Sequence, residues 1–313
     1  MAENKIPVII IFAPTACGKT ACARKIFGKS SLSCFKGRGL VVSADSQAVY
    51  RGFDIGSAKA SPEEQKDLPH YLIDIASPFE QFGLGEWMAE AEKCVKEIWN
   101  KKKFPLIVGG TAFYIRNFIL GMPKTPQSTS EIREMVQKKL HDAGKEALYA
   151  ELEIVDPLTA QKISINDEYR ICRALEVFYS GGKPLSSYKM PVEARNSYDF
   201  CTIILTRPKE ELYERINKRV DLMFEEGLEE EVNNLIKSGC TKESPAMKGI
   251  GYSEFFEPYS NIGELKEKIK NDSRHYAKKQ YTLMKGLPGA VKVDAEDYEK
   301  ILEILSVFCS KWT

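Results

Sequence analysis

The chain has 313 residues, of which 43% are hydrophobic and 28% are charged, the proportions of a folded globular protein. A net charge of +1, from 45 Lys and Arg against 44 Asp and Glu, excludes a uniformly basic nucleic-acid coat but allows a local basic face. Eight cysteines without a C-x-x-C pair argue against a zinc or thioredoxin-type site. The N-terminal apolar run is too short to span a membrane and lacks the basic start of a secretory signal, so we expect a cytoplasmic protein.

The first third of the chain alternates strand and helix patterns. The predicted strands are Val8–Phe12, Leu40–Asp45, Tyr71–Ile75 and Pro105–Gly110. Helices are predicted at Lys19–Lys29 and Gly85–Lys103. This alternation indicates an α/β fold in which a parallel sheet is flanked by helices.

The pattern changes after Gly121. Residues 122–199 begin with a Pro- and Thr-rich linker and continue with helical periodicity, which predicts a mainly helical insertion between the two parts of an α/β core, residues 1–121 and 200–313. The core resumes with a strand at Cys201–Leu205, helices at Lys209–Lys237 and Gly263–Lys285, a strand at Val291–Val293 and a helix at Tyr298–Lys311. The acidic run Glu225–Glu231 is expected to face solvent.

A phosphate-binding loop is predicted directly after the first strand. It comprises Ala13, Pro14, Thr15, Ala16, Cys17, Gly18, Lys19 and Thr20, and it opens a helix. Backbone N–H groups and the helix N-terminus can hold phosphate oxygens there, Lys19 adds a charge, and the Thr20 hydroxyl can bind Mg²⁺. Ala13 replaces the usual first glycine, so a negative φ is expected at that position. The alternative is an ordinary strand–turn–helix with an incidental Gly-Lys-Thr. Cys17 is expected to be a small filler, or else a thiol acidified by its position.

A carboxylate is expected beside this loop. Asp45 ends the second strand, and ligands of such sheets bind beyond the carboxyl ends of the strands. There Asp45 can bind Mg²⁺ or accept a proton from a nucleophile, although an Asx turn is the commoner role of an Asp-Ser pair. The fourth strand ends in Gly109-Gly110-Thr111, where an ATPase would often have an aspartate, and this weakens the ATPase hypothesis without excluding a small-molecule kinase.

Motifs along nearly the whole chain resemble those of the tRNA dimethylallyltransferases, also called tRNA isopentenyltransferases, of the bacterial type. Beyond the loop, the resemblance includes Asp45-Ser46-Gln47, Asp54–Lys59, Pro69–Asp74, Val108–Thr111, Arg173–Val177, Gly249–Tyr252 and Tyr276–Gln280. It implies a P-loop NTPase-like core with a helical insertion. The implied reaction moves a prenyl group from dimethylallyl diphosphate to the N6 amine of an adenosine beside the tRNA anticodon. We expect a monomer that uses Mg²⁺.

The resemblance also implies residue roles. Asp45 would be the general base, Lys19, Thr20 and Arg219 would hold the diphosphate, and the tRNA would contact Asp45, Ser46, Gln47, Ala48, Thr111, Arg133, Tyr169, Arg170, Ile171, Cys172 and Arg173. Ala48 stands where the family often has a second glutamine, and Leu283 stands where it often has a tryptophan.

A basic segment also favours RNA binding. Residues 264–285 hold seven Lys or Arg and three acids, and Arg274, Lys278 and Lys285 have helical spacing. The alternative is a solvated face, with Arg173 of the insertion paired to Glu176. Three hypotheses therefore stand: prenyl transfer to tRNA, a P-loop small-molecule or nucleoside kinase, and an RNA-binding module without catalysis.

Overall fold

The structure is a computed structural model that describes residues 5–312. Close contacts divide the chain into two compact units. One unit joins the residues up to Ile119 with those from Arg195 onward, and the other is Leu120–Ala194. The sequence predicts an insertion at residues 122–199. These boundaries lie close to the two points at which the chain passes from one unit to the other.

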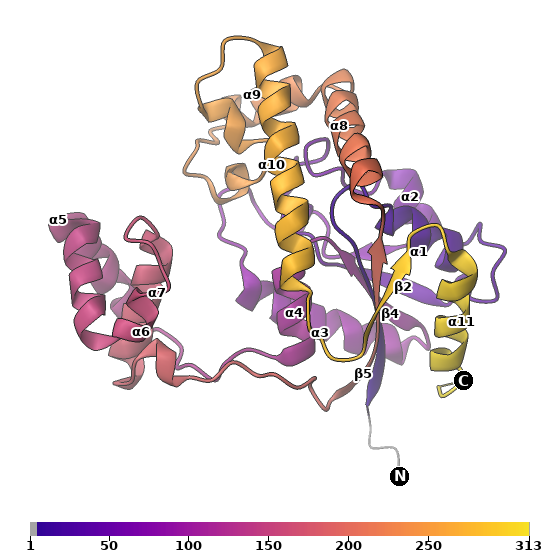
Figure 1. The fold of residues 1–313 in the computed structure, drawn as a ribbon, viewed down its shortest axis with the longest axis horizontal. Helices are drawn as coiled ribbons and strands as arrows, with labels where there is room; N and C mark the ends of the chain where they lie inside the picture. The colour runs from indigo at the N-terminus through magenta and orange to yellow at the C-terminus, as the bar shows by residue number, and fades with distance from the viewer. Residues whose placement is uncertain (1–4, 313) are drawn as a thin grey trace. The chain divides into compact units, whose positions relative to one another are not determined.

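The first unit is built on a six-stranded sheet in which every pair of neighbours is parallel (Figure 1). The strands follow the order β3-β2-β4-β1-β5-β6. Their bounds are β1 Ile6–Phe12, β2 Gly39–Ser43, β3 His70–Tyr71, β4 Phe104–Gly109, β5 Tyr198–Thr206 and β6 Ala290–Asp294. The central strands β1 and β4 are apolar and almost wholly buried, as expected for strands covered on both faces.

Helices cover both faces of this sheet. In β5, Cys201 belongs to a core cluster with residues of α1 (Lys19–Phe27) and α11 (Tyr298–Cys309). The adjacent Phe200 contacts Phe118 of α4 (Ala112–Leu120). Because neighbouring strand residues point to opposite faces, α1 and α11 lie on one side and α4 on the other. The predicted parallel sheet flanked by helices is confirmed.

This unit contains further helices. They are α2 Pro62–Asp67, α3 Leu84–Asn100, α8 Lys209–Glu225, α9 Leu228–Lys237 and α10 Ile262–Leu283, with short 3-10 helices η2 Pro245–Lys248 and η3 Ser253–Phe256. Helices α8 and α10 lie side by side (Figure 1). Residues from both helices line the cavity described below.

Two predicted elements were wrong in extent. The strand expected at Tyr71–Ile75 stops after Tyr71, because Leu72 and Asp74 have φ of 63° and 56°, outside the strand region. The single helix expected at Lys209–Lys237 is two helices, because Gly227 has φ of 101° and separates α8 from α9. This break lies within the acidic run Glu225–Glu231.

The second unit is helical in the part of the chain that the structure describes. It consists of α5 Ser130–Val155, α6 Pro157–Ala160, α7 Glu168–Gly181 and the 3-10 helix η1 Leu185–Ser187. Helix α5 is broken at Gly144, which has φ of 79°. A small core of side chains including Val136, Leu148 and Leu175 holds α5 and α7 together.

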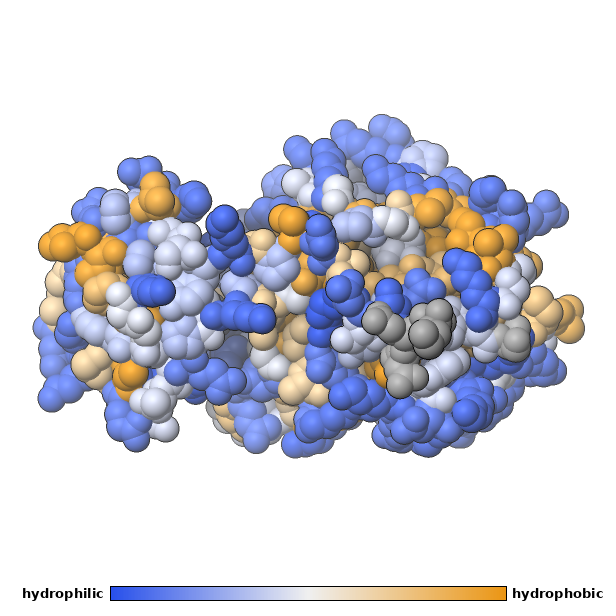
Figure 2. Space-filling view, turned by 90° about the horizontal axis from the view of Figure 1, so that it is seen from below, coloured by the Kyte–Doolittle hydropathy of each residue, from blue (hydrophilic) through white to orange (hydrophobic). Residues whose placement is uncertain are grey.

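On the face shown in Figure 2, hydrophilic residues predominate, and hydrophobic residues gather in a few patches. Among residues 5–312, no helix combines the length and the apolar character that crossing a membrane requires.

Gly109, at the end of β4, lies against the backbone of Ala44. A Cβ added there would lie 2.1 Å from the carbonyl oxygen of Ala44 and 2.3 Å from its carbonyl carbon. Gly109→Ala should therefore lower the free energy of unfolding by about 1–3 kcal/mol or more, measured by urea denaturation. Gly85→Ala is the control, because a Cβ there meets nothing within 4 Å and should change stability by less than about 1 kcal/mol. Equal stability of the two variants would contradict this account.

Candidate active site

The loop between β1 and α1 has the backbone geometry of an anion-binding turn. Ala16 and Gly18 have φ of 60° and 101°, and α1 begins at Lys19. Ala13 is not among the residues with positive φ. This agrees with the negative φ expected where alanine replaces the usual first glycine of the loop. Alternating left-handed residues before a helix turn successive N–H groups toward one side.

Two arginines hold this loop from outside the cavity. The Arg207 Nε donates a 2.9 Å hydrogen bond to the Cys17 carbonyl, and the Arg215 Nε donates one of 2.9 Å to the Ala16 carbonyl. Arg207 is itself fixed by ion pairs with Glu211 and Glu296. Since the loop carbonyls are engaged by these guanidinium groups, the peptide units between them have a fixed orientation.

The Cys17 thiol is not acidified, contrary to one of the two expectations for it. Burial raises its pKa, although Arg207 and Lys19 lie nearby, and the thiol contacts the Leu205 carbonyl at 3.6 Å. The Cys17 side chain is fully buried, as expected for a small residue that fills space inside the loop.

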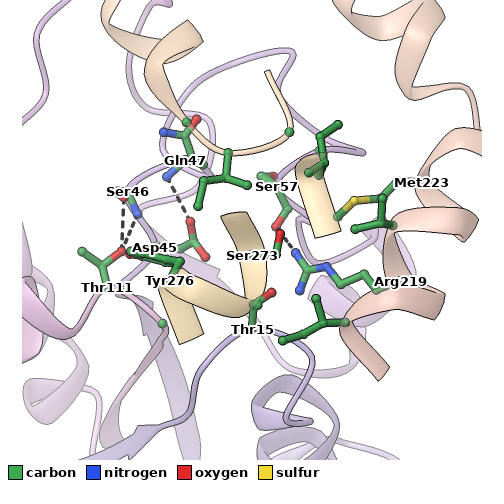
Figure 3. Close-up of a pocket in the computed structure, with 18 of the residues that line it drawn as sticks. Thr15, Asp45, Ser46, Gln47, Ser57, Thr111, Arg219, Met223, Ser273 and Tyr276 are labelled. Carbon is green, nitrogen blue, oxygen red and sulfur yellow. Dashed lines mark hydrogen bonds between the residues drawn. The ribbon is translucent and has the colours of Figure 1, made fainter. Parts of the chain in front are cut away.

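A cavity of about 340 Å³ opens in front of this loop (Figure 3). It brings together the phosphate loop, the ends of β2 and β4, and helices α8 and α10, which are far apart in sequence. Its lining includes Thr15, Lys19, Asp45, Ser46, Gln47, Gly56, Ser57, Gly110, Thr111, Ile216, Arg219, Val220, Met223, Lys248, Gly249, Ile250, Gly251, Ile269, Ser273, Tyr276 and Gln280.

Of the three cations that line this cavity, Lys19 and Arg219 lie near the carboxylate of Asp45, and the third is Lys248. Burial lowers the pKa of Lys19, and the neighbouring Arg219 lowers it further, while Asp45 opposes the shift. Burial also lowers the pKa of Arg219, again opposed by Asp45. Both positive charges are therefore poorly solvated and only partly compensated, which is the electrostatic character of an anion site.

Asp45 forms the turn that the commoner interpretation of Asp-Ser predicted, and it also lines the cavity. Its Oδ1 accepts hydrogen bonds from the N–H groups of Gln47, at 2.9 Å, and Ala48, at 3.3 Å. Within residues 5–312, no protein donor reaches its Oδ2. One oxygen thus shapes the turn, and the other is left for a ligand.

The end of β4 is tied to the turn after Asp45. The Thr111 Oγ1 accepts a 2.9 Å hydrogen bond from the Ser46 N–H and donates one of 3.2 Å to the Ser46 Oγ. Burial and the Asp45 carboxylate raise the pKa of Tyr276, on α10, to about 12, so this phenol is a neutral donor at pH 7. The buried Gln47 Oε1 has no hydrogen-bond donor among the described residues.

Several predicted site residues do not line the cavity. Thr20 lies in the first turn of α1 beside Lys19, and Ala13 and Ala48 are 0% and 4% exposed. Only backbone groups of these two alanines could therefore meet a ligand. Arg274 is hydrogen-bonded to Asn217 and Asn271, whereas Lys278 is exposed and Lys285 lies beyond the end of α10.

The predicted run at residues 169–173 is divided by the fold of the insertion. Ile171 and Cys172 are 0% and 3% exposed in its core, so a side-chain contact from either to RNA is excluded. Arg173 pairs with Glu176 at 3.3 Å, the alternative given for it above. Tyr169 is 77% exposed and Arg170 is exposed. Arg133 is exposed too.

Sequence patterns did not single out several lining residues as site residues. Gln280 is the clearest case: its Nε2 donates a 2.5 Å hydrogen bond to the Gly110 carbonyl, and its Oε1 accepts one of 3.4 Å from the Thr15 N–H. It thereby joins the phosphate loop to the end of β4. An apolar wall was missed as well, formed by Ile216, Val220, Met223, Ile250 and Ile269. The amphipathic helices α8 and α10 predict burial of these side chains but not the cavity they face.

Known proteins resemble this chain over almost its full length. A tRNA dimethylallyltransferase of Thermoanaerobacter sp. (strain X514) is 38% identical over 306 residues, which cover 96% of this chain and 95% of the relative. The relative of the same name from Bacillus anthracis is 37% identical over 310 residues, covering 97% and 95%.

Solved structures of similar proteins are also transferases that act on tRNA or bear that name. The crystal structure of the tRNA isopentenylpyrophosphate transferase of Bacillus halodurans is 30% identical, with a TM-score of 0.68 over 98% of each chain. A eukaryotic dimethylallyltransferase acting on tRNA is 25% identical, with a TM-score of 0.80 over 97% of this chain and 80% of its own. These similarities do not support the kinase alternative. Because the family model for IPP transferase also matches residues 48–286, the chain belongs to the IPP transferase family.

Proposed function

We propose that this protein transfers a dimethylallyl group from dimethylallyl diphosphate to the N6 amine of the adenosine adjacent to the anticodon in tRNA, releasing diphosphate. The observation that carries the proposal is the single cavity lined by Lys19, Arg219 and the Asp45 carboxylate. An anion site and a proton acceptor in one cavity match the two ends of this reaction. The relatives named tRNA dimethylallyltransferase support the same assignment.

The diphosphate would bind at the loop. Lys19 and Arg219 are poorly compensated cations, and a diphosphate would supply the missing negative charge. The N–H groups of Gly18, Lys19 and Thr20, at the N-terminus of α1, add favourable dipoles. No nucleoside triphosphate has to be hydrolysed in this arrangement.

The hydrocarbon would lie against the apolar wall. Ile216, Val220 and Met223 of α8 line the cavity beside Arg219, and Ile250 and Ile269 line it as well. A five-carbon chain attached to a bound diphosphate can bury its surface there, at about 25 cal/mol per Å² of apolar area.

The adenine would bind beside Asp45. Thr111 and Ser46 form the hydrogen-bonded end of the cavity. The Tyr276 ring lines the same cavity and can stack on a base. The adenosine must leave its stack to enter, at a cost of roughly a few kcal/mol, and this is easier from a single-stranded loop.

The reaction then follows from these positions. The N6 nitrogen forms a bond to the first carbon of the prenyl group as the bond from that carbon to the diphosphate oxygen breaks. Lys19 and Arg219 stabilise the negative charge of the leaving diphosphate. The Asp45 Oδ2 accepts the proton that the amine loses, a contribution of about 10²- to 10⁴-fold.

The donor set fits a Mg²⁺ held largely by the substrate. Among the described residues, no group of three His, Cys, Asp or Glu could hold a metal by itself. Mg²⁺ usually binds one or two protein oxygens together with phosphates and waters, and the Thr20 hydroxyl beside Lys19 could be such a ligand. When bound, Mg²⁺ would add positive charge at the leaving group.

We further propose that the insertion contacts the tRNA through exposed side chains, with Arg133, Tyr169 and Arg170 as the candidates. In the core unit, the exposed Lys278 of α10 is the corresponding candidate. Each of these side chains would act on phosphates or bases without taking part in the chemistry.

The change Arg170→Ala tests the role of the insertion. If Arg170 contacts a phosphate, tRNA binding should weaken several-fold, and the slope of the binding constant against salt should fall by about 1. The measurement is a filter-binding titration at several salt concentrations. Lys162→Ala is the control, because Lys162 is an exposed cation of the same unit. An unchanged slope would remove Arg170 from the RNA interface.

The proposed activity is tested by incubating the protein with unmodified tRNA, dimethylallyl diphosphate and Mg²⁺. Mass spectrometry of the digested RNA should find one adenosine that has gained a five-carbon group, and released diphosphate should match it in amount. ATP in place of dimethylallyl diphosphate should give no transfer. Intact adenosine after long incubation, or loss of the ATP γ-phosphate to a small acceptor, would overturn the proposal.

A further inference from the structure

One glutamate of the acidic run faces inward, contrary to the expectation that this run is solvated. Glu231 lies in the first turn of α9, just after the break at Gly227. Its Oε2 accepts hydrogen bonds from the N–H groups of Asp54, at 3.0 Å, and Ile55, at 2.8 Å. Its Oε1 accepts one of 3.2 Å from the Gly56 N–H.

A fourth donor completes the set. The hydroxyl of the fully buried Tyr252 donates a 2.7 Å hydrogen bond to the Glu231 Oε1. The Tyr252 ring also packs against Gly56, where an added Cβ would lie 2.5 Å from the ring. Four donors converge on one carboxylate, and no neutral side chain of similar size could accept from all of them.

The segment that Glu231 holds borders the cavity. Gly56 and Ser57 are lining residues, and the Ser57 carbonyl accepts a 3.1 Å hydrogen bond from the Arg219 guanidinium (Figure 3). Within residues 5–312, this carbonyl is the one protein acceptor that Arg219 meets. The direction of the guanidinium therefore depends on where the segment at residues 54–57 lies.

We propose that Glu231 is a positioning residue for the transfer reaction: it fixes the segment at residues 54–57, and the Ser57 carbonyl in turn aims Arg219 at the diphosphate. The inference rests on the proposed function, because it assigns Arg219 to the leaving group. Glu231 itself touches no reacting atom. A carboxylate is needed here because three adjacent N–H groups donate to it. A glutamine in its place would direct its own N–H donors toward these N–H groups.

The change Glu231→Gln tests this role. It should lower kcat/KM for dimethylallyl diphosphate by about 10- to 100-fold, the scale expected for misplacement of a catalytic group by on the order of 1 Å. The affinity for tRNA should stay unchanged. Glu229→Gln is the matched control, since Glu229 is exposed in the same first turn and contributes equally to the helix dipole.

A double-mutant cycle with Arg219→Ala separates positioning from general damage. If Glu231 acts through Arg219, then Glu231→Gln should cause no further loss of kcat/KM in the Arg219→Ala protein. A loss of the same size in both backgrounds would overturn the route through Arg219. Wild-type kinetics of Glu231→Gln alone would overturn the proposal entirely, with the proposed function left standing.

The same cycle is run on binding of inorganic pyrophosphate, measured by titration calorimetry. The absence of any transfer to tRNA by the wild-type protein would overturn the proposed function. The pyrophosphate measurement would still test the role of Glu231 in that case. A non-additive loss of pyrophosphate affinity supports the proposal, and an additive loss or none contradicts it. If Glu231→Gln fails to fold, Tyr252→Phe takes its place in the cycle, with a smaller loss expected, because it removes one of the four donors.

Discussion

Replacing Asp45 by Ala should lower the rate of dimethylallyl transfer by about 10²- to 10⁴-fold while tRNA still binds. The reason is that the Oδ2 oxygen is the acceptor for the amine proton in the proposed reaction. The measurement is single-turnover transfer with saturating tRNA, together with a binding titration. Single-turnover conditions keep product release out of the measured rate.

Asp45→Asn is the informative control for this prediction. An asparagine Oδ1 can still accept from the Gln47 and Ala48 N–H groups, so the turn is kept while the proton acceptor is lost. Both variants should therefore be slow. A fast Asp45→Asn protein beside a slow Asp45→Ala protein would show that the residue only shapes the turn, and it would discard the general-base role.

Lys19→Met should reduce transfer by about 10²- to 10³-fold and yet raise the thermal stability of the ligand-free protein. Burial lowers the pKa of Lys19, so its charge costs more in the folded state than in the unfolded one. Methionine has a similar length and carries no charge. Thermal unfolding with and without pyrophosphate measures both effects, since pyrophosphate should stabilise the wild-type protein more than the Lys19→Met protein.

The pH dependence of this stability difference has a definite sign. The lowered pKa means that the unfolded state binds more protons, so wild-type stability rises with pH through the folded-state pKa of Lys19. The advantage of Lys19→Met should therefore be largest below that pKa and shrink as the solution becomes more alkaline. Lys218→Met is the control, because Lys218 is exposed on α8, and it should change neither stability nor rate. A destabilised Lys19→Met protein would contradict the cost assigned to the buried charge.

The parts of the site that the sequence predicts are local. The phosphate loop depends on residues within one strand–turn–helix, and Asp45 lies at a strand end, where parallel topology places it at the same edge. The buried strands could be predicted because their apolar runs are continuous. The third strand is shorter than predicted because Leu72 and Asp74 look extended in sequence but have positive φ.

The parts that could not be predicted are non-local. Gln280 meets Thr15 across 265 positions, and Glu231 meets Asp54 across 177. Neither residue type is unusual on a helix surface, so composition and periodicity assign both to solvent. Only the break at Gly227 hints that α9 takes a new direction, and a single glycine does not say which side chain turns inward.

The Gln280 bridge also bears on the order of events during synthesis. The phosphate loop leaves the ribosome early, but the glutamine that ties it to Gly110 belongs to α10, near the end of the chain. The loop therefore lacks its hydrogen bond to Gln280 until almost the whole chain has been synthesised.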